Sequence, residues 1–258
     1  MAGAATTQES FFVTLPSNSS IDDFPDNTLT HYKVRLPHPI HLAGEYECAL
    51  VDATIPTSWY NLISTDDHPT RSSVIYRSGN KVFDKKLREG YYPSIRSLVN
   101  EIRTGEGREL SDVCEINVME RAEKVEFVLE EDCEIVLNGK IARMLGFKTE
   151  YKVIRGHVVP PLTYNIDPIN NLYIYTDILE HEIVGDTRAP LLRVVNVGTR
   201  DGTQLSIHYD TPHYKRVQTK VFDTIEIDIR DGTGEPVPFT RGSLILTLHF
   251  RRKAPSYL

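Results

Sequence analysis

Residues 225–230 read Ile-Glu-Ile-Asp-Ile-Arg, and this alternation of isoleucine with charged residues decides the fold class. Successive side chains of a β-strand point to opposite faces, so an apolar residue at every second position describes a strand with one buried face. The same alternation occurs at 31–36, at 125–129 and at 244–250. We therefore predict an all-β protein in which these segments are strands.

One segment, Glu45 to Ile55, is apolar at nearly every position after Glu47, which is typical of a strand covered on both faces. We predict that it lies centrally in a sheet. Only two segments show helical spacing, Pro93 to Arg103 and Asn138 to Leu145, the second with Asn138 as its predicted N-cap. Roughly eight to ten strands with two short helices in loops predict a single jelly-roll β-sandwich.

The first residues differ in composition from the rest, because polar and turn-forming residues surround one short apolar segment, Phe11 to Leu15. We predict an N-terminal arm over residues 1–25, a single jelly-roll domain over 26–253 and a C-terminal tail over 254–258. The apolar segment could add a strand to an exposed sheet edge of a neighbouring subunit. An ordinary first strand of its own sandwich is an equally good interpretation.

The chain of 258 residues carries 36 acidic and 29 basic side chains, a formal net charge of -7. Such a molecule repels a phosphate backbone, so we do not expect a general nucleic-acid binder. The basic cluster Arg251, Arg252 and Lys253 could still touch nucleic acid or an acidic partner, although a solvated strand end is the simpler interpretation. We expect no transmembrane helix, and Met1 to Ser10 lacks the pattern of a secretory signal, which favours an intracellular origin.

The residue types that carry enzyme chemistry form no recognisable site in the sequence. The nine histidines are scattered, and neither a metal-ligand spacing nor a phosphate-binding glycine loop occurs. Three cysteines, an odd number, argue against a disulfide framework, and we expect Cys48, Cys114 and Cys133 to be small core residues. We therefore predict no metal site, no cofactor and no catalytic activity.

Tyrosines and the single tryptophan are the remaining signal. Residues 172–178 read Leu-Tyr-Ile-Tyr-Thr-Asp-Ile, which places Tyr173 and Tyr175 on the face opposite the apolar one. Trp59 and Tyr60 follow closely after Pro56. Aromatic residues of this kind either anchor interfaces or lie in a core or at its edge, and both interpretations stay open.

Five blocks of the sequence form a recognisable series. The two longest are FPDNTLTHYKVRLPHPIHLAGEYECALVDATIPTSWYNL at 24–62 and LYIYTDILEHEIVGDTRAPLLRVV at 172–195. Between them lie GYYPSIRSLVNEI at 90–102 and LGF at 145–147, and VPFTRGSLILTLHFRR at 237–252 follows. In this order the blocks resemble the minor capsid, or penton, protein of Maverick/Polinton elements and the related adintoviruses.

The resemblance implies a single jelly roll that forms homopentamers at the fivefold vertices of an icosahedral capsid. It implies a separate double-jelly-roll major capsid protein as partner, no enzyme activity, and a location in the virion, with assembly in the host nucleus. We expect aromatic residues and one loop stretch to make subunit or capsid contacts: Trp59, Tyr60, Tyr173, Tyr175 and the stretch from Glu180 to Arg193. The cluster Arg251 to Lys253 would lie at the inner face of the capsid, near packaged DNA or the major capsid protein.

Two other functions remain open for a jelly roll. A lectin-like or receptor-binding module would stack sugars on its loop aromatics and would bind glycans without pairing with a major capsid protein. A cupin-like enzyme would retain a bound metal through purification.

Overall fold

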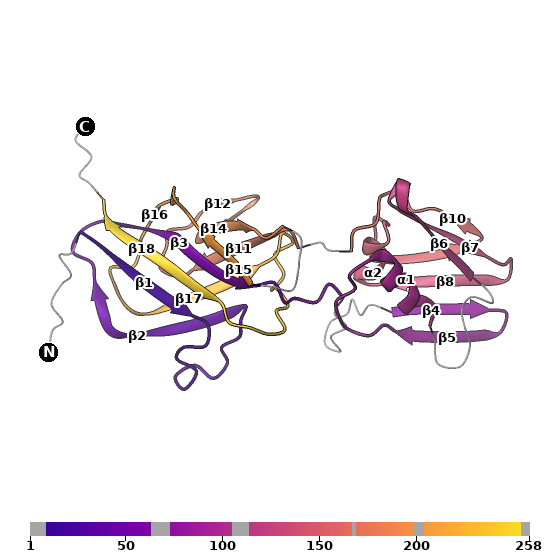
Figure 1. The fold of residues 1–258 in the computed structure, drawn as a ribbon, viewed down its shortest axis with the longest axis horizontal. Coiled ribbons are helices and arrows are strands. Elements are labelled where there is room, and N and C mark those ends of the chain that lie inside the picture. Colours follow the sequence, from indigo (N-terminus) through magenta and orange to yellow (C-terminus); the bar gives the residue numbers. More distant parts are fainter. Residues whose placement is uncertain (1–8, 63–72, 105–113, 167–168, 199–203, 254–258) are drawn as a thin grey trace. The chain divides into compact units, whose positions relative to one another are not determined.

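The structure is a computed structural model that describes residues 9–62, 73–104, 114–166, 169–198 and 204–253. The chain forms two compact units. Unit 1 comprises Met1–Trp59 and Ile169–Leu258, and unit 2 comprises the intervening Tyr60–Pro168. In Figure 1, unit 1 therefore contains both the indigo start and the yellow end of the chain. Unit 2 is an insertion into unit 1.

Unit 1 is a sandwich of two antiparallel sheets. The first sheet has the order β1-β18-β3-β15, and β16 also pairs with β3. Its strands are β1 (Ser10–Pro16), β3 (Tyr46–Pro56), β15 (Gln204–His208), β16 (Lys215–Arg216) and β18 (Ile245–Arg252). Strand β3 lies between β18 and β15, which confirms the central position predicted for it.

The second sheet of unit 1 has the order β14-β11-β17-β2. Its strands are β2 (His31–His41), β11 (Asn171–Thr176), β14 (Leu191–Asn196) and β17 (Val221–Arg230). In chain order, the first and last long strands pair in one sheet, and the second and second-last pair in the other, which is the jelly-roll arrangement. Between β11 and β14 the chain forms a separate hairpin of β12 (Glu182–Val184) and β13 (Thr187–Ala189).

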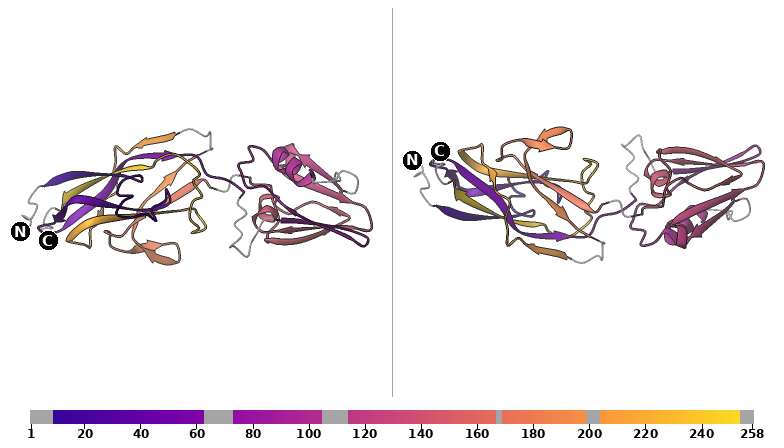
Figure 2. Two further views of the ribbon diagram at one scale, coloured as in Figure 1. Left: turned by 90° about the horizontal axis from the view of Figure 1, so that it is seen from below. Right: turned by 90° about the horizontal axis from the view of Figure 1, so that it is seen from above.

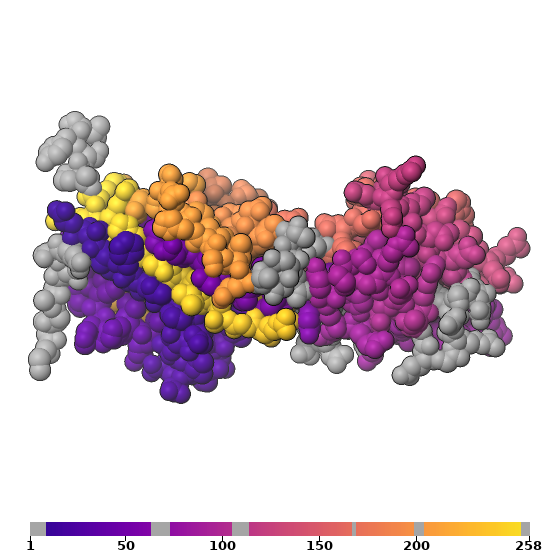
Figure 3. Space-filling view, viewed as in Figure 1, coloured from indigo at the N-terminus to yellow at the C-terminus, as the bar shows by residue number. Residues whose placement is uncertain are grey.

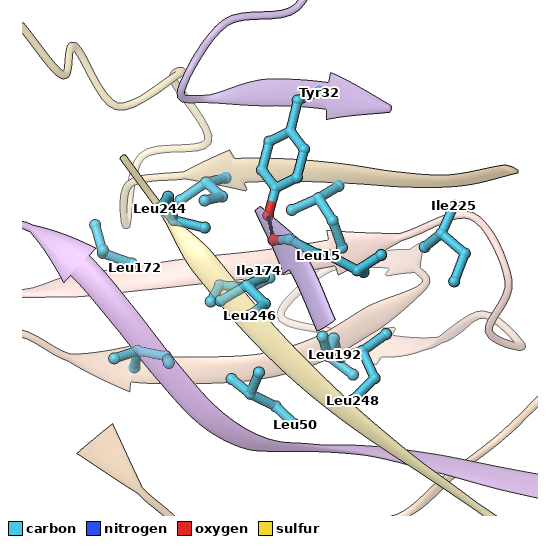
Figure 4. Packing of buried hydrophobic residues seen from close by; sticks show 14 of the residues in the cluster. Leu15, Tyr32, Leu50, Leu172, Ile174, Leu192, Ile225, Leu244, Leu246 and Leu248 are labelled. Atoms are coloured by element: carbon cyan, nitrogen blue, oxygen red, sulfur yellow. Dashed lines mark hydrogen bonds between the residues drawn. The ribbon is translucent and has the colours of Figure 1, made fainter. Parts of the chain in front are cut away.

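The core of unit 1 fills the space between the two sheets, as Figure 4 shows. Apolar side chains from the long strands meet there, among them Leu15, Leu50, Leu172, Ile174, Leu192, Ile225, Leu246 and Leu248. The buried Tyr32 hydroxyl donates a hydrogen bond of 3.2 Å to the carbonyl of Leu15, which links the two sheets. Truncating one buried leucine to alanine is expected to cost about 2–5 kcal/mol of stability.

Unit 2 has its own hydrophobic core and two sheets, with the orders β5-β4-β8-β9 and β10-β7-β6. The strands are β4 (Ser73–Ser78), β5 (Lys81–Lys86), β6 (Cys114–Met119), β7 (Lys124–Leu129), β8 (Cys133–Asn138), β9 (Tyr151–Arg155) and β10 (His157–Val158). The helices are α1 (Ile95–Arg103), α2 (Lys140–Met144) and the short 3-10 helix η2 (Glu120–Ala122). The apolar face of α1 joins this core, as its helical spacing predicts.

The all-β fold class and both helices are confirmed. Cys48, Cys114 and Cys133 are buried and free, as predicted. The N-cap of the second helix differs, because Gly139 with a φ of 75° occupies that position and Asn138 ends strand β8. None of the helices in the described part of the chain has the length and apolar character needed to span a membrane.

The predicted domain boundaries need two corrections. Residues 26–253 do not form one domain, because the buried residues between Leu62 and Ile154 form a core separate from that of the sandwich, and the helices lie there. The predicted arm over 1–25 is wrong for Ser10–Pro16, which form an edge strand of their own sandwich. Residues 1–8 and the predicted tail over 254–258 lie outside the described residues.

Candidate interaction surfaces

An aromatic row crosses the outer face of the first sheet of unit 1. Phe12 of β1 lies opposite His249 of β18, and their rings stack with centroids 4.5 Å apart and planes at 20°. The Tyr214 hydroxyl lies 2.7 Å from Nδ1 of His249. We call Phe12, His249 and Tyr214 the aromatic row. Phe12 is 65% exposed, so one end of the row is open to solvent.

Arg251 extends the aromatic row toward β3. Its guanidinium lies 3.4 Å from the centroid of the Tyr214 ring, and its Nη2 lies 3.0 Å from Oε2 of Glu47. Burial lowers the pKa of His249, and the positive charge of Arg251 lowers it further. At neutral pH the row is therefore an uncharged aromatic surface with a cation beside it. In the space-filling view of Figure 3, the yellow β18 is visible at the surface beside the indigo β1.

The predicted basic cluster at the end of β18 is largely paired with carboxylates. Arg251 bonds to Glu47, and Nζ of Lys253 lies 3.8 Å from Oε2 of Glu45. Arg252 is exposed. The cluster therefore presents less free positive charge than its sequence indicates.

Tyr173 and Tyr175 lie on the outer face of the second sheet, on β11, and both are half-buried. Their partners across the sheet are Arg230 and Asp228 of β17, whose side chains form an ion pair of 2.7 Å. Burial raises the pKa of Tyr175 above its ordinary value. The structure thus brings the two predicted tyrosines together in one patch bordered by an ion pair.

A charged ladder beside these tyrosines was not identified from the sequence. One carboxylate oxygen of Glu226 lies 2.6 Å from Nε2 of His31, and the other lies 3.0 Å from Nζ of Lys33. Partial burial raises the pKa of Glu226, but the hydrogen bonds from His31 and Lys33 outweigh this effect, so its pKa lies below the ordinary value. The sequence shows alternating charges at 31–35 and at 226–230. These charges predict the ladder only when the register between the two strands is known.

The stretch that begins at Glu180 forms the β12–β13 hairpin, whose strands pair only with each other, with Ile183 opposite Arg188. Nζ of Lys215 contacts both carboxylate oxygens of Glu182, at 2.6 and 2.5 Å. Ile183 is 79% exposed, more than any other large hydrophobic residue in the described ranges. Figure 2 shows that the hairpin projects from the sandwich.

The remaining predicted contact residues have different environments. Trp59 does not fit a contact role, because its side chain is fully buried in unit 1 and meets the ring of Phe239 edge-on at 5.9 Å. Tyr60 is 37% exposed and belongs to unit 2. Arg193 of β14 lies 3.8 Å from the centroid of the Tyr209 ring, and its Nη1 is buried. Arg193 therefore packs within unit 1.

Across the ranges that the structure describes, no group of three or more His, Cys, Asp or Glu side chains is arranged to hold a metal ion.

No protein-family model matches the chain, and no curated protein matches it in sequence. Several solved structures are similar to it, among them the following two. The crystal structure of the mavirus penton protein is 11% identical, covers 95% of this chain and 99% of that chain, and has a TM-score of 0.47. A chain in the cryo-EM structure of the Sputnik virophage is 12% identical, covers 97% of this chain and 100% of that chain, and has a TM-score of 0.51. The likeness to the Sputnik virophage chain shows that the two chains share a fold, and this fold is an all-β jelly roll.

Proposed function

We propose that the protein is a structural, non-enzymatic component of an icosahedral capsid, namely a minor capsid (penton) protein of the Maverick/Polinton and adintovirus kind. The observation that carries the proposal is the jelly-roll order of unit 1 with unit 2 inserted between β3 and β11. The likeness to a chain of the Sputnik virophage extends over 97% of the sequence, so it includes both units. The sequence resemblance supports the same assignment.

In the proposed assembly, five copies form a ring at each capsid vertex. A closed ring requires a heterologous interface, in which one surface of a copy meets a different surface of the next. Two surfaces of unit 1 support this role: the patch of Tyr173 and Tyr175, and the stretch from Glu180 to Arg193 with the exposed Ile183. Obligate interfaces bury roughly 2,000 Å² or more, so these residues would form only part of the contact.

The proposed partners beyond the ring are a double-jelly-roll major capsid protein and, more weakly, packaged DNA. The weak contact with DNA follows from the charge of the Arg251 to Lys253 cluster, which Glu45 and Glu47 largely offset. The proposed location is the capsid vertex, with assembly in the host nucleus.

Negative-stain electron microscopy of the purified oligomer tests the proposal. Class averages of a ring with fivefold rotational symmetry are the expected result. A ring of another symmetry would contradict the proposed pentamer. Glycan binding by a chain that does not self-associate would instead favour the lectin-like function.

A further inference from the structure

Two exposed apolar side chains lie on opposite sides of unit 1. Ile183 on the β12–β13 hairpin is 79% exposed, and Phe12 in the aromatic row is 65% exposed. Figure 2 shows the hairpin beyond the sheet that contains β11 and β14, on the side of the sandwich away from β1 and β3. The aromatic row lies on the outer face of the sheet that contains β1 and β18.

The hairpin is held in a defined position although it belongs to neither sheet. An isolated two-stranded hairpin is only marginally stable in water, so its anchoring contacts decide whether it is ordered. The ion pair of Lys215 with Glu182 fixes one strand, and the main-chain N–H of Glu180 donates to the carbonyl of Arg216 at 3.0 Å. Arg188 donates to the carbonyl of His181 at 3.4 Å. Ile183 is therefore presented by an ordered segment, which reduces the entropy lost on binding.

The aromatic row is equally well fixed. His249 is held between the ring of Phe12 and the hydroxyl of Tyr214, and Arg251 is held by Glu47. An ordered aromatic surface beside an arginine has the composition of an interface hot spot.

The two surfaces carry opposite net charge. Around Ile183, the ion pair of Glu182 with Lys215 is neutral, and the two carboxylates of Glu180 and Asp186 outnumber the single cation of Arg188. Beside the aromatic row, four cations outnumber three carboxylates: Arg251, Arg252, Lys253 and Arg216, which lies opposite Glu47, against Glu9, Glu45 and Glu47. An apolar and acidic surface is thus complementary to an apolar and basic one.

We propose that the β12–β13 hairpin of one copy docks on the aromatic row of a second copy of the chain, with Ile183 against Phe12. Glu180 and Asp186 then face the cations at the end of β18. This inference rests on the proposed function, because it names the contact through which copies assemble. The hairpin and the aromatic row are different surfaces on opposite sides of unit 1. When two copies dock, one copy therefore keeps a free aromatic row and the other keeps a free hairpin. The contact can therefore repeat from copy to copy, and it gives a ring when the rotation between neighbouring copies closes.

Two single substitutions test the contact, each with a matched control. Ile183→Asp removes the hairpin surface, and Ile21→Asp is its control because Ile21 is 52% exposed elsewhere on unit 1. Phe12→Thr removes the open end of the aromatic row, and Val221→Thr is its control because Val221 is 55% exposed. Unfolding midpoints in urea establish that each variant remains folded. We expect the two test variants to weaken self-association about 30-fold or more, which is the loss typical of a hot-spot residue, and the controls to leave it unchanged.

Mixing the two test variants gives the sharper result. The Ile183→Asp copy keeps its aromatic row, and the Phe12→Thr copy keeps its hairpin. In an equimolar mixture the intact hairpin can dock on the intact aromatic row, and the two remaining surfaces are both altered, so no further copy can be added. Native mass spectrometry is expected to show a one-to-one heterodimer of about 59 kDa, twice the 29.4 kDa of the chain, with nothing larger. Homodimers of either variant, or a mixture that stays monomeric, would overturn the proposed contact.

A cross-linking experiment tests the same contact within the complete oligomer. The double variant Ile183→Cys with Phe12→Cys, treated with a short bismaleimide, is expected to give a ladder of covalent multimers, and neither single-cysteine variant should give one. Absence of the ladder in an oligomeric double variant would overturn the contact. If Ile183→Asp and Phe12→Thr both keep the oligomer of the wild-type chain, this contact is wrong while the proposed ring stands. A wild-type chain that does not self-associate contradicts the ring itself.

Discussion

The side-chain amide of Asn27 pairs with the main chain of Lys33 on the free edge of β2. Its Oδ1 accepts from the Lys33 N–H at 2.9 Å, and its Nδ2 donates to the Lys33 carbonyl at 2.8 Å. The hydroxyl of Ser20 accepts from the N–H of Arg35, and that of Thr28 accepts from the N–H of His31. This edge of the sheet is therefore closed by the segment that precedes it, which leaves it unable to add a strand from another chain.

Asn27→Ala should destabilise unit 1 and open this edge. The substitution removes both hydrogen bonds, so we expect a loss of about 1–2 kcal/mol in the free energy of unfolding, together with slow aggregation of the folded protein. Urea unfolding and light scattering measure the two effects. Asn18→Ala, at an exposed position in the same segment, is the control and should change stability by less than about 0.5 kcal/mol. Equal behaviour of the two variants would refute the role given to Asn27.

Replacing Tyr173 and Tyr175 together by serine should weaken assembly and leave a folded monomer. Both side chains are only half-buried on the outer face of β11, so their loss removes little of the core but most of the aromatic patch. Size-exclusion chromatography reports the assembly state, and the urea midpoint reports folding. Tyr151→Ser, at a tyrosine of unit 2 that is 61% exposed, is the matched control. Unchanged assembly of the double variant would remove this patch from the interface.

His249 makes unit 1 less stable as the pH falls. Burial and the charge of Arg251 place its pKa below the ordinary 6.5, so the unfolded chain binds more protons than the folded one between that lowered pKa and 6.5. The groups that face His249 are Phe12, Tyr214 and Arg251, and Glu47 lies behind Arg251. His249→Gln should therefore reduce the loss of stability measured by urea unfolding between about pH 7.5 and 5.5.

His208 provides the opposite sign in the same unit. Its hydrogen bond and charge interaction with Asp52 raise its pKa above 6.5, so its contribution to stability is fully present below pH 6.5 and is lost as the pH rises through the raised pKa. His208→Gln should therefore steepen the fall of stability on acidification. The prediction for His249 fails if both variants change the pH profile in the same direction.

The alternation of 225–230 and 244–250 correctly predicts strands β17 and β18, but it does not predict which sheet each joins. The two lie in opposite sheets of the sandwich, and the similarly patterned 125–129 lies in unit 2. The physical reason is that a period of two reports which face of a strand is buried and contains no information on what buries it. For the same reason, the alternation does not predict that unit 2 has a hydrophobic core of its own.

The candidate surfaces were only partly predictable. Tyr173 and Tyr175 were placed on the outer face because β11 keeps its alternation. The sequence does not separate the two roles of Trp59, because a large aromatic residue after a proline has the same local sequence whether it anchors an interface or, as here, fills a core. The exposure of Ile183 and Phe12 has no signal in the sequence, because the strand of Phe12 pairs with the far end of the chain and Ile183 lies in a local hairpin that joins neither sheet of the sandwich.

Trp59→Phe tests the corrected role of Trp59. Its side chain is fully buried, so we expect the substitution to lower the stability of unit 1 by about 1–2 kcal/mol and to leave the association of the folded protein unchanged. The urea midpoint by far-ultraviolet circular dichroism gives the first quantity, and size-exclusion chromatography below that midpoint gives the second. Loss of assembly in a fully folded variant would show that Trp59 contributes to the subunit interface.

The central claim is that the chain assembles into a ring of five. Native mass spectrometry of the purified wild-type protein at moderate salt tests it most directly. The account predicts a dominant species of about 147 kDa, five times the 29.4 kDa of the chain. A dominant species at 29.4 kDa, or at any multiple other than five, would contradict it.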